Sequence, residues 1–240
     1  MSVLVVSGTG TDVGKTVVTA ALAACAKAKG SVAVVKPAQT GVTPNGRGDL
    51  AEVTRLAGVT DVHEYARYPD PLSPHQAARV SGLPELEFAD AVRRINDLDA
   101  LHDLVLVEGA GGLLVPFTTT DGWTVADLAS ALHAEVVVVT DPGLGTLNHT
   151  ALTVGRLAED GITLGGIVLG RWPEEPDLAM RCNLDDLAAM APGGALAGVL
   201  PDGLPAMTQF AKHARAALAP RFGGTFRWSA FAAANRQVGI

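Results

Sequence analysis

A glycine-rich segment near the N-terminus carries the residues best suited to bind phosphate. The segment GTGTDVGKT occupies residues 8–16 and follows an apolar, β-branched run. In a P-loop, G-x-x-x-x-G-K-[ST], backbone N–H groups cradle phosphates, the lysine reaches the β- and γ-phosphates, and the hydroxyl binds Mg²⁺. Lys15 and Thr16 match this pattern, but Thr9 stands where the first glycine belongs, with a glycine on either side. The segment predicts phosphate binding; a plain glycine-rich strand-to-helix turn is the alternative.

Three charged residues farther along the chain suit phosphoryl transfer and metal binding. Lys36 ends an apolar run and could neutralise charge on a transferred phosphoryl group, although a solvated strand-end lysine is the alternative. Glu108 ends another apolar run and precedes three glycines in four residues. Asp49 with Glu52 forms a capping-box pattern, so helix capping competes with metal binding there. Together with Thr16, the carboxylates Asp49 and Glu108 offer three hard oxygen ligands of the kind that Mg²⁺ prefers.

A second candidate anion site lies in TDPGLGTLNH, residues 140–149. Its glycines free the backbone before a helical pattern, and a helix N-terminus attracts anions. The alternative is an ordinary strand-to-helix loop in which Thr146 caps the helix.

The elements that position these residues alternate along the chain. We expect strands at 3–8, 31–36, 103–108, 135–140, 165–170 and 197–200, and helices near 15–29, 49–57, 85–97, 124–132, 146–160, 177–190 and 206–218. Continuously apolar strands are typical of a parallel sheet covered on both faces. The pattern therefore predicts an α/β fold, a single-domain, doubly wound, mostly parallel sheet with helices on both faces. Ligands of such sheets bind at the carboxyl ends of strands, where the residues above fall.

Composition and charge restrict the class of protein. The 240 residues carry a formal charge of −7, and Lys and Arg are scattered, which argues against a nucleic-acid partner. Two distant cysteines and the lack of a membrane-length apolar run favour a cytoplasmic protein without a membrane anchor. Residues 37–84 are the least regular, and 225–240 fit no element. We expect one domain over 1–220 and a tail of unknown role over 221–240.

Five motifs resemble, in family order, those of the dethiobiotin synthetases of biotin biosynthesis. They are GTGTDVGKT (8–16), KPAQTG (36–41), PLSPH (71–75), VEGAGG (107–112) and LGTLNH (144–149). Each motif is weak alone, but five in order over residues 3–205 are specific. The family carries the same P-loop, with its first glycine one place farther from Gly14 than in the standard motif, so the loop is lengthened by one residue.

The resemblance implies a P-loop NTPase-like ligase that needs Mg²⁺ and ATP or another nucleoside triphosphate. Its substrates would be 7,8-diaminopelargonate and CO₂ or bicarbonate, and the product the ureido ring of dethiobiotin. A homodimer would bind the substrate near the subunit interface. The resemblance assigns the nucleotide to Gly10, Thr11, Asp12, Val13, Gly14, Lys15, Thr16 and Val17, and the metal to Thr16, Asp49 and Glu108. It assigns catalysis to Lys36, Lys15 and Thr11, and substrate contact to Thr11, Lys36, Thr40, Gly111, Gly143, Leu144, Gly145, Thr146, Leu147 and Asn148.

One position departs from the family pattern. Where family members carry an Asn-Asp-like pair that reads adenine, this chain has Gly170 and Arg171. Glycine offers no side chain to the base, so we expect weak discrimination among nucleoside triphosphates. The loop of Pro201, Asp202, Gly203 and Leu204 would supply backbone contacts to the base.

Two other P-loop classes compete with this interpretation. Cobyrinate-type amide ligases need a glutaminase domain with a nucleophilic cysteine, for which 240 residues leave no room. Partition- or septum-positioning ATPase switches carry a signature lysine just ahead of the P-loop glycines, where this chain has Gly10. Their basic or amphipathic membrane tail also has no match in the sparse arginines of the C-terminal segment.

Overall fold

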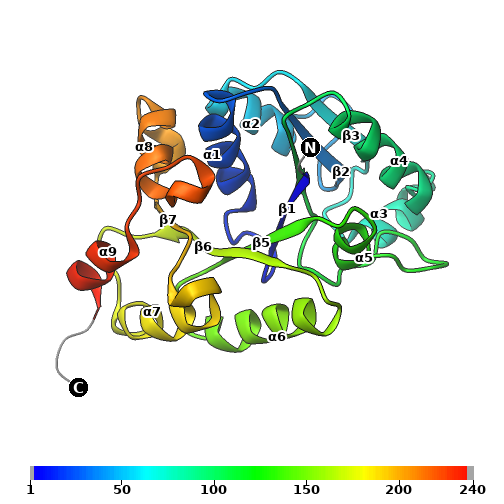
Figure 1. Ribbon diagram of the computed structural model, residues 1–240. Helices are drawn as coiled ribbons and strands as arrows, with labels where there is room; N and C mark the ends of the chain where they lie inside the picture. The colour runs from blue at the N-terminus through cyan, green and yellow to red at the C-terminus, as the bar shows by residue number, and fades with distance from the viewer. Residues whose placement is uncertain (1–2, 237–240) are drawn as a thin grey trace.

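A single seven-stranded sheet forms the centre of the protein (Figure 1). The computed structural model describes residues 3–236. Every pair of neighbouring strands is parallel, in the order β3-β2-β4-β1-β5-β6-β7. The strands are β1 (Val3–Gly8), β2 (Val32–Gln39), β3 (Val62–Arg67), β4 (Leu104–Glu108), β5 (Glu135–Thr140), β6 (Leu164–Trp172) and β7 (Gly198–Pro201). The expected α/β class and parallel sheet are confirmed.

Helices connect the strands and cover both faces of the sheet (Figure 1). The α-helices are α1 (Lys15–Lys27), α2 (Asp49–Ala57), α3 (Pro74–Ser81), α4 (Phe88–Asp99), α5 (Val125–Ala131), α6 (Thr146–Glu159), α7 (Leu178–Met190), α8 (Phe210–Ala217) and α9 (Trp228–Asn235). Short 3₁₀ turns are η1 (Pro192–Gly194), η2 (Leu204–Ala206) and η3 (Pro220–Phe222). In the described part of the chain, each helix falls short of the length and apolar character that a membrane span requires.

The buried strands supply the core on two sides. Along β1, Leu4 and Val6 face the layer of α1, α2 and α8, whereas Val5 faces the layer that contains α4 and α5. Because successive side chains of a strand point to opposite faces, a strand covered on both faces must be apolar throughout. This explains why β1, β4 and β5 read as continuous apolar runs.

The strand order places the functional residues at one edge of the sheet. β1 lies between β4 and β5, and the chain crosses over it when it passes from β4 to β5. In an open parallel sheet, such a reversal of strand order opens a crevice at the carboxyl ends of the strands. The residues after β1, β2 and β4 therefore meet there.

The segment 37–84, predicted to be the least regular part of the chain, contains a strand and a helix in addition to the expected helix at 49–57. β3 pairs with β2 at the sheet edge, and α3 follows it. All six residues of β3 are only partly buried, and three of them are His63, Glu64 and Arg67. An edge strand tolerates such polar residues, so it lacks the apolar run by which the other strands were recognised.

The prediction that residues 225–240 fit no element was wrong, because α9 lies within them. Phe231 of α9 packs edge-on against Trp172, with ring centroids 5.4 Å apart, and lies beside Phe226. The helix therefore covers an apolar cluster that includes the end of β6. Residues 237–240 of the segment lie outside the described residues.

Candidate active site

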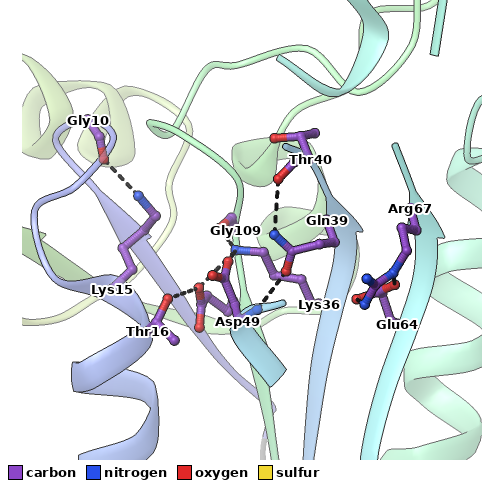
Figure 2. Close-up of polar contacts among 11 residues, drawn as sticks. Gly10, Lys15, Thr16, Lys36, Gln39, Thr40, Asp49, Glu64, Arg67 and Gly109 are labelled. Atoms are coloured by element: carbon purple, nitrogen blue, oxygen red, sulfur yellow. Dashed lines mark hydrogen bonds and ion pairs between the residues drawn. The ribbon is translucent and has the colours of Figure 1, made fainter. Parts of the chain in front are cut away.

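The P-loop joins β1 directly to α1. Gly14 is the N-cap of α1 and adopts a left-handed conformation with φ 96°, which glycine accepts without the strain of a Cβ. Lys15 begins the helix, and its Nζ donates to the Gly10 carbonyl at 2.7 Å across the loop (Figure 2). Burial, assisted by the nearby charge of Lys36, lowers the pKa of Lys15 to about 8. The loop thus places a lysine at a helix N-terminus, where the first backbone N–H groups have no intrahelical partner, and this arrangement binds phosphate.

Lys36 lies between two carboxylates at the carboxyl end of the sheet (Figure 2). Its Nζ lies 2.7 Å from Asp49 Oδ2 and 2.8 Å from Glu108 Oε1, and it donates to the Gly109 carbonyl at 3.1 Å. Burial opposes the charge of Lys36, but Glu108 and Asp49 outweigh it and raise the pKa of the lysine. Lys36 is therefore a charged group held in the site, which excludes the alternative of a solvated strand-end lysine.

Thr16, Asp49 and Glu108 fit the donor set expected for Mg²⁺. The Thr16 hydroxyl donates to Glu108 Oε1 at 2.8 Å, which leaves its oxygen lone pairs available to a cation. Glu108 is 0 % exposed, and among the described residues its Oε2 has no hydrogen-bond partner. A buried carboxylate oxygen without a partner is costly unless a cation or donor reaches it. These three residues could therefore hold a hard divalent cation.

The start of α2 presents Asp49 to this cluster. The N-cap of α2 is Gly48, which has no side chain, and Asp49 is the first helical residue, so the capping-box alternative for Asp49 is wrong. Glu52 instead pairs with Arg55. The buried Gln39 side chain accepts a hydrogen bond from the Asp49 backbone N–H through Oε1 at 2.8 Å. Its Nε2 donates to the Thr40 carbonyl at 3.1 Å (Figure 2). Gln39 was not predicted; its position at the end of β2 was the available signal.

A cavity of 980 Å³ joins the P-loop to the charged cluster. The predicted residues that line it are Thr11, Asp12, Gly14, Lys15, Thr16, Val17, Lys36, Thr40, Asp49, Glu108, Gly111 and Arg171. Lining residues that were not predicted include Gln39, Pro71, Leu72, Ser73, Pro74 and Val115. Four of these, Pro71–Pro74, lie in the PLSPH motif, for which the sequence predicted no role. The cavity does not include Gly10, Val13, Gly170, Pro201–Leu204 or Gly143–Asn148 among its lining residues.

The P-loop packs against β6 at the position that departs from the family pattern. A Cβ at Gly170 would lie 1.9 Å from the Val13 carbonyl oxygen, so this contact requires glycine. The next residue, Arg171, donates to the Asp12 carbonyl. Pro201 lies beside this point because it pairs with Trp172. Gly170 thus allows the P-loop to pack directly against β6, and the Arg171 side chain fixes the loop at Asp12.

The loop before α6 lies apart from the cavity. The N-cap of α6 is Gly145, with no side-chain cap, so the interpretation of Thr146 as the cap was wrong. The Thr146 hydroxyl instead lies 2.8 Å from that of Thr140. Asn183 of α7 donates to the Pro142 and Gly143 carbonyls and holds the loop from its other side.

The parallel sheet and the P-loop between β1 and α1 define a P-loop nucleotide-binding protein of the α/β class. Comparison with known proteins supports that class and narrows it. The sequence model of the AAA domain matches residues 2–207. The cell-division ATPase MinD of Pyrococcus furiosus has a TM-score of 0.53 at 20% identity, covering 89% of this chain and 94% of its own. A MinC:MinD complex chain of Aquifex aeolicus has a TM-score of 0.52 at 13% identity, covering 89% and 86%. At these identities the likeness shows the fold alone.

Much closer sequence relatives identify the family. The chain is 63% identical over 204 residues to the ATP-dependent dethiobiotin synthetase BioD of Rhodococcus jostii, covering 85% of this chain and 87% of the relative. It is 57% identical to that of Frankia casuarinae, with 97% and 98% covered, and 55% identical to that of Streptomyces avermitilis, with 98% and 99% covered. The chain belongs to the dethiobiotin synthetase family.

Gly170→Ala tests how the P-loop is seated. The added Cβ must displace the Val13 carbonyl, and overpacking of this kind costs about 1–3 kcal/mol. We expect the Kd for Mg²⁺-nucleotide, measured by calorimetry, to rise about ten-fold or more. Gly155→Ala is the matched control, because a Cβ there meets nothing within 4 Å. Equal affinity in both variants would contradict the close contact.

Lys36→Met tests whether Lys36 balances the charge of the buried carboxylates. Removing one partner of a buried ion pair costs about 3–5 kcal/mol, which lowers the melting temperature by roughly 6–20 °C. With Lys36 gone, Mg²⁺ alone should stabilise the variant several degrees more than it stabilises the wild type, because the metal takes over the role of counter-charge. Thermal melts with and without Mg²⁺ measure this.

Lys27→Met is the control for that melt, since Lys27 is exposed and donates only to a backbone carbonyl, that of Gly58, in the described structure. It should gain no metal dependence. The same Mg²⁺ shift in Lys36→Met and in the wild type would show that the metal does not bind at these carboxylates.

Proposed function

We propose that this protein closes the ureido ring of dethiobiotin from 7,8-diaminopelargonate and CO₂, at the cost of a nucleoside triphosphate. One amine of the substrate attacks CO₂ and loses a proton to form a carbamate. A carbamate oxygen takes the γ-phosphoryl group and releases the nucleoside diphosphate. The second amine then attacks the carbonyl of this mixed anhydride, and phosphate leaves. The observation that carries the proposal is the convergence of Lys15 and Lys36 on one cavity in a chain of this family.

Lys15 and Lys36 would stabilise charge at different points of the transfer. Lys15 lies within the P-loop and would hold the β- and γ-phosphates. Lys36 lies between Asp49 and Glu108 and would neutralise the carbamate and the transferred phosphoryl group. Thr11, Thr40 and Gly111 would be further contacts. Phosphoryl transfer depends on such positioning and charge neutralisation more than on an acid–base pair.

Thr16, Asp49 and Glu108 would hold Mg²⁺ beside the triphosphate. The metal supplies charge neutralisation at the phosphate oxygens when it is bound. The buried Oε2 of Glu108, which has no partner in the described structure, supports this assignment. Glu108 would also keep Lys36 charged, because the two groups lie 2.8 Å apart.

A second copy of the chain would complete the substrate site. Gly143 to Asn148 do not line the cavity, so they would reach a substrate only from a neighbouring subunit. The first turn of α6 would bind the distant carboxylate of diaminopelargonate through backbone N–H groups. Leu144 and Leu152, which are 92 % and 66 % exposed, are apolar residues that a homodimer interface would cover.

The proposal also covers where the nucleotide base binds, in which compartment the enzyme acts and where its domain ends. The nucleotide base would lie between Gly170, Arg171 and the loop Pro201–Leu204, with contacts to the backbone of that loop. Cys25 and Cys182 are both free thiols, which is in keeping with a cytoplasmic enzyme. We assign the P-loop domain to residues 1–220 and keep 221–240 as a C-terminal segment of unknown role.

The decisive experiment measures phosphate release with Mg²⁺-ATP and bicarbonate, with and without diaminopelargonate. We expect release to depend on diaminopelargonate and dethiobiotin to accumulate in equal amount. Lys36→Ala should lower kcat far more than it weakens nucleotide binding, since Lys36 acts on the transferred group. ATP hydrolysis that ignores diaminopelargonate would instead favour a septum-positioning type of ATPase switch.

Weak base discrimination is the expected result of glycine at position 170. One missing hydrogen bond to the base corresponds to about 1 kcal/mol, so kcat/KM for ATP, CTP and GTP at subsaturating nucleotide should agree within about ten-fold. Competition assays with pairs of nucleotides measure this ratio. A much larger preference for ATP would mean that the 201–204 loop or Arg171 reads adenine.

A further inference from the structure

Four threonine hydroxyls meet where the P-loop lies against the end of β5, which is on the opposite side of β1 from β4 and Glu108. Thr140, the last residue of β5, is at the centre. Its hydroxyl lies 3.1 Å from that of Thr9, 2.8 Å from that of Thr146 and 2.9 Å from that of Thr150. Thr140 and Thr150 are 0 % exposed and Thr146 is 5 % exposed. We call these four residues the threonine cluster.

The cluster is a saturated hydrogen-bond network. A hydroxyl donates one hydrogen bond and accepts two, so three hydroxyl neighbours match the full capacity of Thr140. Loss of this hydroxyl would leave the buried hydroxyls of Thr146 and Thr150 with only their long mutual contact of 3.5 Å, and weakened satisfaction of buried polar groups is costly. The arrangement of the cluster is therefore strongly constrained.

The threonine cluster joins the P-loop, which would bind the nucleotide, to the N-terminus of α6, which would bind the substrate carboxylate. Thr9 belongs to the P-loop and donates its backbone N–H to the Val139 carbonyl at 3.0 Å. Thr146 and Thr150 belong to the first turns of α6, which has no side-chain cap. The hydroxyl of Thr140 is thus the link between the nucleotide loop and the N-terminus of α6.

The two parts differ in how far they depend on this link. The P-loop is also held by the bonds from Lys15 to the Gly10 carbonyl and from Arg171 to the Asp12 carbonyl. The start of α6 is held by the threonine cluster, and the loop just before it is held by the hydrogen bonds from Asn183 to the Pro142 and Gly143 carbonyls. Loss of the cluster should therefore disturb the helix N-terminus more than the nucleotide loop.

We propose that Thr140 is a positioning residue for the substrate, which aligns the first turn of α6 to receive the substrate carboxylate. The inference rests on the proposed function, because it takes the diaminopelargonate carboxylate as the ligand of that turn. Thr140 touches neither substrate nor nucleotide and acts only through Thr146, Thr150 and Thr9.

The test compares Thr140→Val, which keeps the shape and removes the hydroxyl, with Thr140→Ser, which keeps the hydroxyl. KM for diaminopelargonate comes from phosphate release at saturating Mg²⁺-ATP and bicarbonate, and the nucleotide Kd comes from calorimetry. We expect Thr140→Val to raise KM for diaminopelargonate about ten-fold and to change the nucleotide Kd less than about two-fold. Thr140→Ser should behave like the wild type.

Thr153→Val is the matched control, because Thr153 lies on α6 and its hydroxyl donates to the His149 carbonyl outside the cluster. It should leave both constants unchanged. If Thr140→Val does not fold, Thr150→Val decides the question, since it removes one of the three partners and should raise the same KM.

An unchanged KM in Thr140→Val, or equal loss in the valine and serine variants, would overturn the inference, because the hydroxyl would then have no positioning role. Equal weakening of nucleotide and diaminopelargonate binding would also overturn it. Absence of diaminopelargonate-dependent phosphate release by the wild-type protein would overturn the proposed function as well.

Discussion

The candidate active site depends on one completely buried carboxylate. Glu108 ends the interior strand β4 and is 0 % exposed, and a buried charge costs several kcal/mol unless it is paired and hydrogen-bonded. The strand order supplies partners for Glu108, because β4 lies between β2 and β1. Lys36 therefore comes from one side and Thr16, after β1, from the other. Asp49 adds a second carboxylate beside Lys36, and this excess of negative charge suits a divalent cation.

The same edge of the sheet also limits how the phosphate-binding loop can lie. Gly170 leaves just enough room for the Val13 carbonyl, and Arg171 holds the neighbouring Asp12 carbonyl. The threonine cluster supports the loop near Thr9, within its lengthened part. Gly170, the P-loop and the start of α6 are consequently connected through backbone packing and hydroxyl contacts rather than through one continuous pocket.

Fold and function separate clearly in this protein. The MinD ATPases share its architecture at 20% identity or less, yet one α/β fold supports many activities, so this likeness indicates no reaction. The reaction is argued instead from the family and from particular side chains. A second lysine, Lys36, lies beside the carboxylates proposed to hold Mg²⁺, and this makes the site suited to transfer of a phosphoryl group to a small-molecule oxygen.

The sequence by itself determined the parallel α/β fold and much of the cavity, because buried strands are continuously apolar and their carboxyl ends carry Lys36, Glu108 and the P-loop. It could not predict β3, since an edge strand lacks that pattern, or α9, whose aromatic contacts join distant segments. Local pattern also suggested helix-cap roles for Asp49 and Thr146. Only the tertiary structure, through contacts with Lys36 and Thr140, decided that both side chains serve longer-range interactions, because the same short motif can cap a helix or reach a residue far away in sequence.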